Sequence, residues 1–268
     1  MKNLKLAVLS CAVLCSSMTM AVPTINSLQT QAYGLYALHH PEVKNTNAST
    51  FSQSFAEDYN DLFKNQKSVN REQYVQFEQA RLTSVMQQRR DMSVKQAHVR
   101  FGVLNSNKDD KITLKEYQAV GLKTFDHFDK NQDGLVNAAD AQLDKTPTGT
   151  HDGLKIKSPL SMPMPSTVND FIEMYAVNNN SYVTLGDYLS HRDQQFFATD
   201  TNKDLVLSEQ EYVTEFTQRY DEHSAKAKSE YDLIFTQQFQ SIAGKKDRIT
   251  QKDLQNYAKK LYTSLDVK

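Results

Sequence analysis

The feature that most constrains this chain is a twelve-residue segment in which oxygen-bearing side chains recur at fixed positions. It runs from Asp129 to Asp140, with Asp129, Asn131 and Asp133 at positions 1, 3 and 5 and Gly134 at position 6. A hard divalent cation takes about six to eight oxygen ligands. Glycine permits the positive φ that a chain needs to turn sharply around an ion. The pattern therefore predicts a cation-binding loop rather than an ordinary polar turn.

A second copy of this pattern runs from Asp200 to Glu211. Asp200, Asn202 and Asp204 stand at positions 1, 3 and 5. Leu205 replaces the glycine, and a left-handed backbone costs a non-glycine residue about 1 kcal/mol. We expect this loop to bind a cation, but more weakly than its glycine-containing counterpart.

The third copy runs from Asn105 to Glu116 and departs from the pattern at two positions. Asn105 stands where the other two loops have aspartate, which removes one negative charge, and Asp110 replaces the glycine. Aspartate tolerates the left-handed region better than most residues. We expect a divalent-cation site here as well.

The fourth copy, Ala176 to Asp187, has lost most of its ligands. Asn178, Asn180 and Thr184 keep the polar pattern, but Ala176 has no side-chain oxygen and Asp187 is the single carboxylate. We expect a structural loop without metal.

The four segments form an internal repeat. Loops start at residues 105 and 129 and again at 176 and 200, so each pair is 24 residues apart and the two pairs are offset by 71. The offset also aligns Phe125 with Phe196, four residues before a loop in each pair. This regularity indicates two copies of a double unit.

The 24-residue spacing limits what can lie between neighbouring loops. The 14 residues from Lys115 to Phe128 would make about 21 Å of helix at about 1.5 Å per residue. Two helices and a turn do not fit comfortably, so we expect one shared helix with a loop at each end. Long strand-like alternation is absent, and the sequence predicts an all-α fold.

These segments resemble the EF-hand superfamily, and specifically exported bacterial proteins whose loops recur every 24 residues. The resemblance covers residues 97–214 well and the flanks poorly. It implies multiple helix–loop–helix units with short β contacts between loops, and Ca²⁺ as the bound ion. The Asp129–Asp140 loop by itself also resembles a dockerin repeat, although the aromatic residues before the loops and the glutamate-closed loops argue against that family.

The EF-hand resemblance also implies a ligand set at positions 1, 3, 5, 7, 9 and 12 of three loops, with position 7 contributing its main-chain carbonyl. The implied ligands are Asn105, Asn107, Asp109, Lys111, Thr113 and Glu116; Asp129, Asn131, Asp133, Leu135, Asn137 and Asp140; and Asp200, Asn202, Asp204, Val206, Ser208 and Glu211. Glutamate at position 12 is long enough to bind bidentately, which favours Ca²⁺. Asp140 is shorter, so Mg²⁺ is a possible ligand of the Asp129–Asp140 loop.

Two further triplets resemble positions 7 to 9 of such loops. They are Ser68-Val69-Asn70 and Arg248-Ile249-Thr250, in loops that would start near Leu62 and Ile242. Neither loop has carboxylates where ligands are needed. We expect metal-free hands that pair with the loops at 105 and 200, while the loops at 129 and 176 pair with each other.

The first 21 residues have the order of a secretion signal. Lys2 and Lys5 precede an apolar run from Leu6 to Leu14, and Ala21 offers a small residue for cleavage. We expect a periplasmic or secreted protein without a membrane span. Cys11 and Cys15 both lie in this segment, so the mature chain would lack disulfides; lipidation of one of them is the rival interpretation.

The remaining chain divides by composition. We expect a polar linker or arm over 22–56, a first EF-hand half over 57–143, a proline-rich linker over 144–167 and a second half over 168–268. Without residues 1–21 the formal net charge changes from −1 to −3, which does not favour nucleic acid as a partner.

The function expected from these patterns is Ca²⁺ binding by an exported protein that acts as a sensor, a buffer or a Ca²⁺-stabilised binding protein, with an unidentified protein as a possible partner. The five methionines after residue 21 are too few for a methionine-rich target groove, which weighs against a sensor. The alternative is an adhesion, scaffold or dockerin-like module in which Ca²⁺ is structural. We expect no enzymatic activity, because the sequence lacks a nucleophile elbow, a zinc-binding HExxH and a phosphate loop.

Overall fold

The structure is a computed structural model that describes residues 25–40, 47–145 and 159–264. The expected secretion signal, residues 1–21, lies outside the described residues. So does most of the expected proline-rich linker, residues 146–158.

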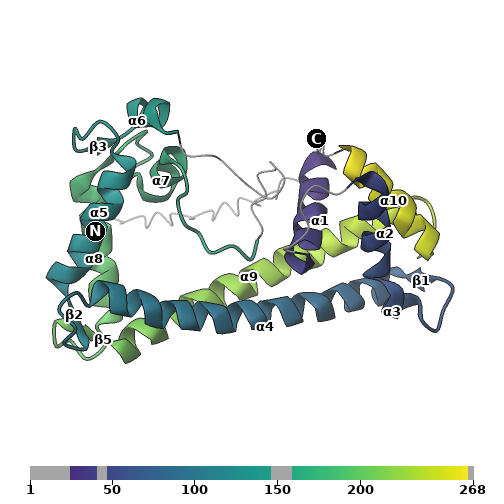
Figure 1. Cartoon of the computed structure of the whole chain (residues 1–268), viewed down its shortest axis with the longest axis horizontal. Helices are drawn as coiled ribbons and strands as arrows, with labels where there is room; N and C mark the ends of the chain where they lie inside the picture. Colours follow the sequence, from purple (N-terminus) through teal and green to yellow (C-terminus); the bar gives the residue numbers. More distant parts are fainter. Residues whose placement is uncertain (1–24, 41–46, 146–158, 265–268) are drawn as a thin grey trace, which may run out of the picture.

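The described chain is mostly helical, as the sequence predicts, with short strands between helices (Figure 1). The helices are α1 (Ile25–His39), α2 (Ala48–Glu57), α3 (Asn60–Phe63), α4 (Arg71–Leu104), α5 (Leu114–Phe128), α6 (Ala138–Leu143), α7 (Val168–Tyr175), α8 (Leu185–Thr199), α9 (Glu209–Ala243) and α10 (Gln251–Ser264). The strands are β1 (Val69–Asn70), β2 (Lys111–Thr113), β3 (Leu135–Val136), β4 (Val183–Thr184), β5 (Val206–Ser208) and β6 (Arg248–Ile249).

Two long helices give the molecule its length. α4 has 34 residues and α9 has 35, and they pack along each other with a group of smaller elements at each end (Figure 1). Midway along them a core forms around Leu82 and Val85 from α4 and Tyr231 and Phe235 from α9. These buried side chains join the two helices, and the helices in turn hold the two end groups apart.

Three two-stranded antiparallel sheets link the earlier part of the chain to the later part. They pair β1 with β6, β2 with β5 and β3 with β4. Each sheet contributes two facing aliphatic side chains with no exposed surface: Val69 and Ile249, Ile112 and Leu207, Val136 and Val183. The apolar residue at position 8 of each loop therefore anchors the loop to the core.

The pairing differs from the prediction for the outer triplets. The strands that contain Val69 and Ile249 pair with each other, and the loop at 105 pairs with the loop at 200. The expected pairing of the loops at 129 and 176 is confirmed. The reason for the difference is the length of α4, since its 34 residues place β1 about 51 Å from the loop at 105.

The segment expected to be a polar arm, residues 22–56, contains two helices instead. Tyr33 and Tyr36 from α1 and Phe51 and Phe55 from α2 are buried in one aromatic cluster. The Asn47 side chain caps α2 by accepting hydrogen bonds from two backbone amides. The many Ser, Thr, Asn and Gln residues of this segment hid these aromatic residues in a pattern that resembled a linker.

The helix predicted between neighbouring loops is confirmed. α5 begins at Leu114, directly after one loop strand, and ends at Phe128, directly before the next loop. α8 occupies the same position in the second copy. None of the helices in the described ranges combines the length and hydropathy that a bilayer crossing requires.

Candidate metal-binding loops

The aspartate at position 1 organises the loop that starts at residue 129. One Asp129 carboxylate oxygen accepts a hydrogen bond from the Asp133 backbone amide at 3.2 Å, and the other accepts one from Gly134 at 2.9 Å. Asn131 accepts a second bond from the Asp133 amide at 3.0 Å, and Asp133 accepts one from Leu135 at 2.9 Å. The polar side chains are thereby turned toward the loop's own backbone.

The carboxylate at position 12 closes the same loop. Asp140 accepts hydrogen bonds from the amides of Lys130 at 2.8 Å and Asn131 at 3.1 Å, and from Asn137 at 2.9 Å. Its side chain is fully buried. The first turn of α6 is thus tied back to the backbone at positions 2, 3 and 9 of the loop.

The loop that starts at residue 200 repeats these bonds. Asp200 accepts from the amides of Asp204 at 3.2 Å and Leu205 at 2.9 Å. Glu211 accepts from Thr201 at 3.1 Å and Ser208 at 3.0 Å. The two loops share one hydrogen-bonding plan despite having Gly134 in one and a leucine in the other.

The loop that starts at residue 105 keeps most of the plan. Asn105 accepts from the Asp109 amide at 3.2 Å, but where an aspartate has its second acceptor oxygen the asparagine has an NH₂ donor. Glu116 closes the loop by accepting from Ser106 at 3.0 Å and Thr113 at 2.9 Å. The asparagine therefore removes both a charge and an acceptor.

The fourth loop has a different backbone. The other three have positive φ at positions 4 and 6, as at Gln132 and Gly134, whereas this loop has it at Asn178 and Asn179, positions 3 and 4. Asp187 accepts from the Thr184 hydroxyl at 2.7 Å. Its metal-free state stays a prediction, and the altered turn accords with it.

Sequence reasoning missed one contributor, the hydroxyl at position 2. Ser106 donates to Glu116 at 2.9 Å, and Thr201 donates to Glu211 at 3.0 Å. The sequence did offer a signal for this bond, because both loops that end in glutamate have a hydroxyl-bearing residue at position 2.

The oxygen atoms of the loop side chains are chemically suited to bind a cation. Asp129, Asp140 and Asp200 are buried, and a buried charge is costly unless it is compensated. A carboxylate has about four acceptor positions, and each of these three takes only two or three of the hydrogen bonds described above. Lone pairs therefore remain for an ion.

The structure does not assemble these carboxylates into a dense cluster. Among the described residues, no group of three or more His, Cys, Asp or Glu side chains is placed to hold a metal ion. In each loop the carboxylate at position 12 is engaged by main-chain amides. The other candidate ligands include amide, hydroxyl and main-chain oxygens, which complete a ligand set without further carboxylates.

Exchange of leucine and glycine at position 6 tests the loop backbone. Leu205 has φ 67° and is 65 % exposed, whereas Gly134 has φ 84° and open space where a Cβ would lie. Left-handed backbone costs a non-glycine residue about 1–2 kcal/mol, so Leu205→Gly is expected to raise the unfolding free energy by up to about 1 kcal/mol. Gly134→Leu is expected to lower it by a similar amount. Urea unfolding in a chelator measures both, and equal signs for the two substitutions would contradict the argument.

Acid is expected to weaken the two glutamate-closed loops. The Thr113 amide, followed by the Ser106 hydroxyl, lowers the pKa of Glu116 from 4.5 to about 2. Burial opposes the charge of Glu211, but bonds from Ser208 outweigh it and hold its pKa at about 2. A depressed carboxylate pKa stabilises the fold above the unfolded value and loses that effect as pH falls through the folded value. The unfolding free energy should therefore fall between pH 4.5 and 2, and less steeply in the Glu116→Gln/Glu211→Gln variant, as followed by circular dichroism.

Comparisons with known proteins did not identify a related protein. No family model, no curated protein and no solved structure matches this chain.

Proposed function

We propose that this chain binds Ca²⁺ through three EF-hand loops, residues 105–116, 129–140 and 200–211. The observation that carries the proposal is the recurrence of one hydrogen-bonding plan in the three loops. In each, position 1 accepts from position 5, and position 12 accepts from positions 2 and 9.

The three loops differ in which ion they are suited to bind. Glu116 and Glu211 are long enough to bind in bidentate fashion, which favours Ca²⁺, whereas Asp140 also admits Mg²⁺. Extracellular Ca²⁺ modules bind at about 10⁻⁴ to 10⁻³ M, and the leucine at 205 and the asparagine at 105 place their loops in this weak range.

The strand pairing suggests that ion binding is coupled between two of the loops and independent in the third. β2 and β5 join the loops at 105 and 200 through three residue pairs. An ion bound in one loop would therefore order its strand, and through the strand pairing it would also order the other loop. β3 and β4 join the loop at 129 to the loop at 176, which is expected to be silent. We therefore expect coupled binding in the first pair and independent binding at 129.

The position of the coupled pair suggests what the ions do. α4 ends at Leu104, just before one loop, and α9 begins at Glu209, within the other. Filled loops would fix the ends of the two long helices relative to α5 and α8. Bound Ca²⁺ would then stabilise one relative orientation of these helices. We also propose that residues 1–21 direct export of the protein.

Calorimetric titration of the chain from residue 22 onward tests the proposal. Two or three Ca²⁺ sites are expected. Asp129→Ala should remove one site and leave the others unchanged, whereas Asp200→Ala should remove one and weaken the site at Asn105 as well. Absence of heat and of any thermal shift with Ca²⁺ would refute the proposal.

A further inference from the structure

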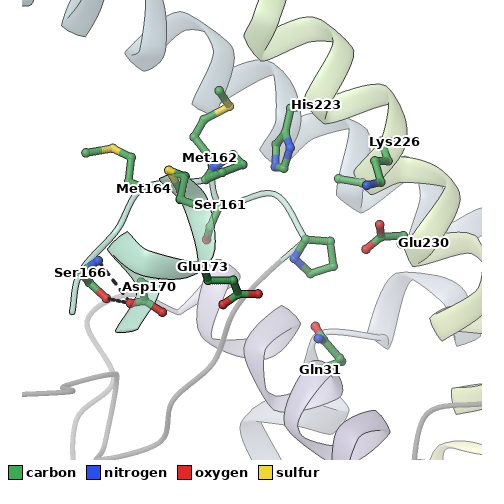
Figure 2. Close-up of a pocket in the computed structure, with 14 residues that line it drawn as sticks. Gln31, Ser161, Met162, Met164, Ser166, Asp170, Glu173, His223, Lys226 and Glu230 are labelled. Carbon is green, nitrogen blue, oxygen red and sulfur yellow. Dashed lines mark hydrogen bonds between the residues drawn. The ribbon is translucent and has the colours of Figure 1, made fainter. Parts of the chain in front are cut away.

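A pocket of about 570 Å³ lies beside the middle of α9 (Figure 2), and its lining residues include none from the three loops. Four segments line it: α1, the chain from 159 to 166, α7 and α9. Leu160 is buried in the core between α4 and α9 and holds the second of these segments in place. The pocket is therefore built from parts of the chain that are far apart in sequence.

Methionines are concentrated in this pocket. The described residues contain five methionines, of which Met162, Met164 and Met174 line it. Met164 is 59 % exposed and Met174 is 37 % exposed. Filling of the hydrophobic core does not account for side chains that are this exposed.

A histidine with an unused ring nitrogen joins them from α9. His223 lines the same pocket, and Figure 2 shows it facing the segment that carries Ser161 and Met162. Its Nε2 atom is buried and has no hydrogen-bond partner among the described residues. Buried polar atoms are normally paired, and a ligand in the pocket would give this nitrogen a partner. Neutral imidazole nitrogen is a common metal ligand.

We propose that this pocket is a soft-metal site that binds Cu(I), with the thioethers of Met162, Met164 and Met174 and Nε2 of His223 as its ligands. Thioether sulfur selects Cu(I), and imidazole also suits copper. Carboxylate and carbonyl oxygens instead suit Mg²⁺ and Ca²⁺. The donor set of this pocket thus differs in kind from that of the three loops.

The carboxylates in the pocket do not make a hard-cation site. Asp170 accepts bonds from Ser166 at 2.7 and 3.2 Å and from Thr167 at 3.1 Å, which commits it to the start of α7. Glu173 and Glu230 carry charge that offsets a bound cation without having to bind it.

Two cationic side chains lie near the proposed ligands. Arg100 donates to the Met164 sulfur at 3.6 Å, and Lys226 lines the pocket from α9. Methionine has three rotatable bonds and adapts readily, so the contact with Arg100 does not fix the Met164 sulfur in one position.

Titration with Ag(I), a redox-inert probe for the same ligands, tests the site in chloride-free nitrate buffer. One Ag(I) per chain is expected. Loss of a group that only supports a ligand costs about 10- to 100-fold in metal affinity, so the Met162→Leu/Met164→Leu/Met174→Leu variant and the His223→Gln variant should each bind at least about tenfold more weakly. Met92→Leu, at an exposed methionine of α4, is the matched control and should bind as the parent does.

Methyl NMR of the unmutated protein gives a second readout that does not depend on how the variants fold. The ε-methyl signals of Met162, Met164 and Met174 are expected to shift with one equivalent of Ag(I), while those of Met86 and Met92 stay in place. The same shifts are expected with Ca²⁺ present or absent, so this result is independent of the loops. Unshifted signals, equal shifts at all five methionines, or full affinity in the triple variant would overturn the proposal.

Discussion

Under the proposed Ca²⁺ binding, removal of the ions by a chelator is expected to lower the unfolding free energy by several kcal/mol. A ligand that binds only the folded state at 100 times its Kd stabilises it by about 2.7 kcal/mol per site, so two or three filled loops amount to about 5–8 kcal/mol. The physical cause is the buried carboxylates of Asp129, Asp140 and Asp200, whose charges an ion offsets. Urea unfolding with Ca²⁺ and with chelator measures the difference.

Two variants separate binding in the loops from general ionic effects. Asp129→Ala/Asp200→Ala removes the position-1 carboxylate of two loops, and its response to the chelator should fall to that of the remaining site at Asn105 or less. Asp126→Ala removes an exposed carboxylate from α5 and should respond as the parent protein does. A double variant that keeps the full response would show that the ions bind elsewhere.

The sequence predicted the local features of the loops because these depend on a few residues at fixed spacing. The left-handed turn at Gly134 follows from the twelve-residue pattern and is found in the structure. The shared helix from Leu114 to Phe128 follows from the 24-residue interval. The hydrogen bonds from the loop side chains to main-chain amides were not predicted, because the pattern was interpreted in terms of ligands to an ion, and that ligand set stays a prediction.

The long-range arrangement could not be predicted from the same patterns. Pairing of Val69 with Ile249 joins residues 180 positions apart, and it depends on how α4 and α9 lie together. Neither helix shows an uninterrupted apolar stripe, because its buried contacts change partner along its length. The N-terminal helices were missed since the aromatic cluster around Phe51 depends on packing with α10, through Tyr262.

A partly buried charge network around Glu78 of α4 was also outside the reach of sequence patterns. Glu78 is 1 % exposed and accepts a short hydrogen bond from the Tyr59 hydroxyl. Arg81 contacts Glu78 at 3.4 Å and Asp58 at 3.0 Å, and it lies over the Tyr59 ring at 5.1 Å. Asp58 in turn bonds His40, at 2.9 Å. One guanidinium thus links the end of α1, the chain after α2 and α4.

Replacement of Arg81 by leucine is expected to lower the unfolding free energy by about 3–5 kcal/mol, because it leaves a buried carboxylate without its cation. Arg90→Leu is the matched control, since Arg90 also lies on α4 and pairs with Asp221, but both side chains are well exposed. Exposed pairs contribute about 0–1 kcal/mol, so this control should change stability little. Urea unfolding at neutral pH compares the two variants.

The pH dependence of the Arg81→Leu variant identifies the buried carboxylate as the cause. Burial raises the pKa of Glu78, and Arg81 partly reverses that shift. Without the guanidinium the folded pKa rises further. A carboxyl group whose folded pKa is raised stabilises the fold below its unfolded pKa and loses that effect as pH rises through the folded value. The stability deficit of the variant should therefore shrink as pH is lowered from 7 toward 4.5. A deficit of constant size over this range would assign the loss to packing of the Arg81 side chain on Tyr59 instead of to its charge.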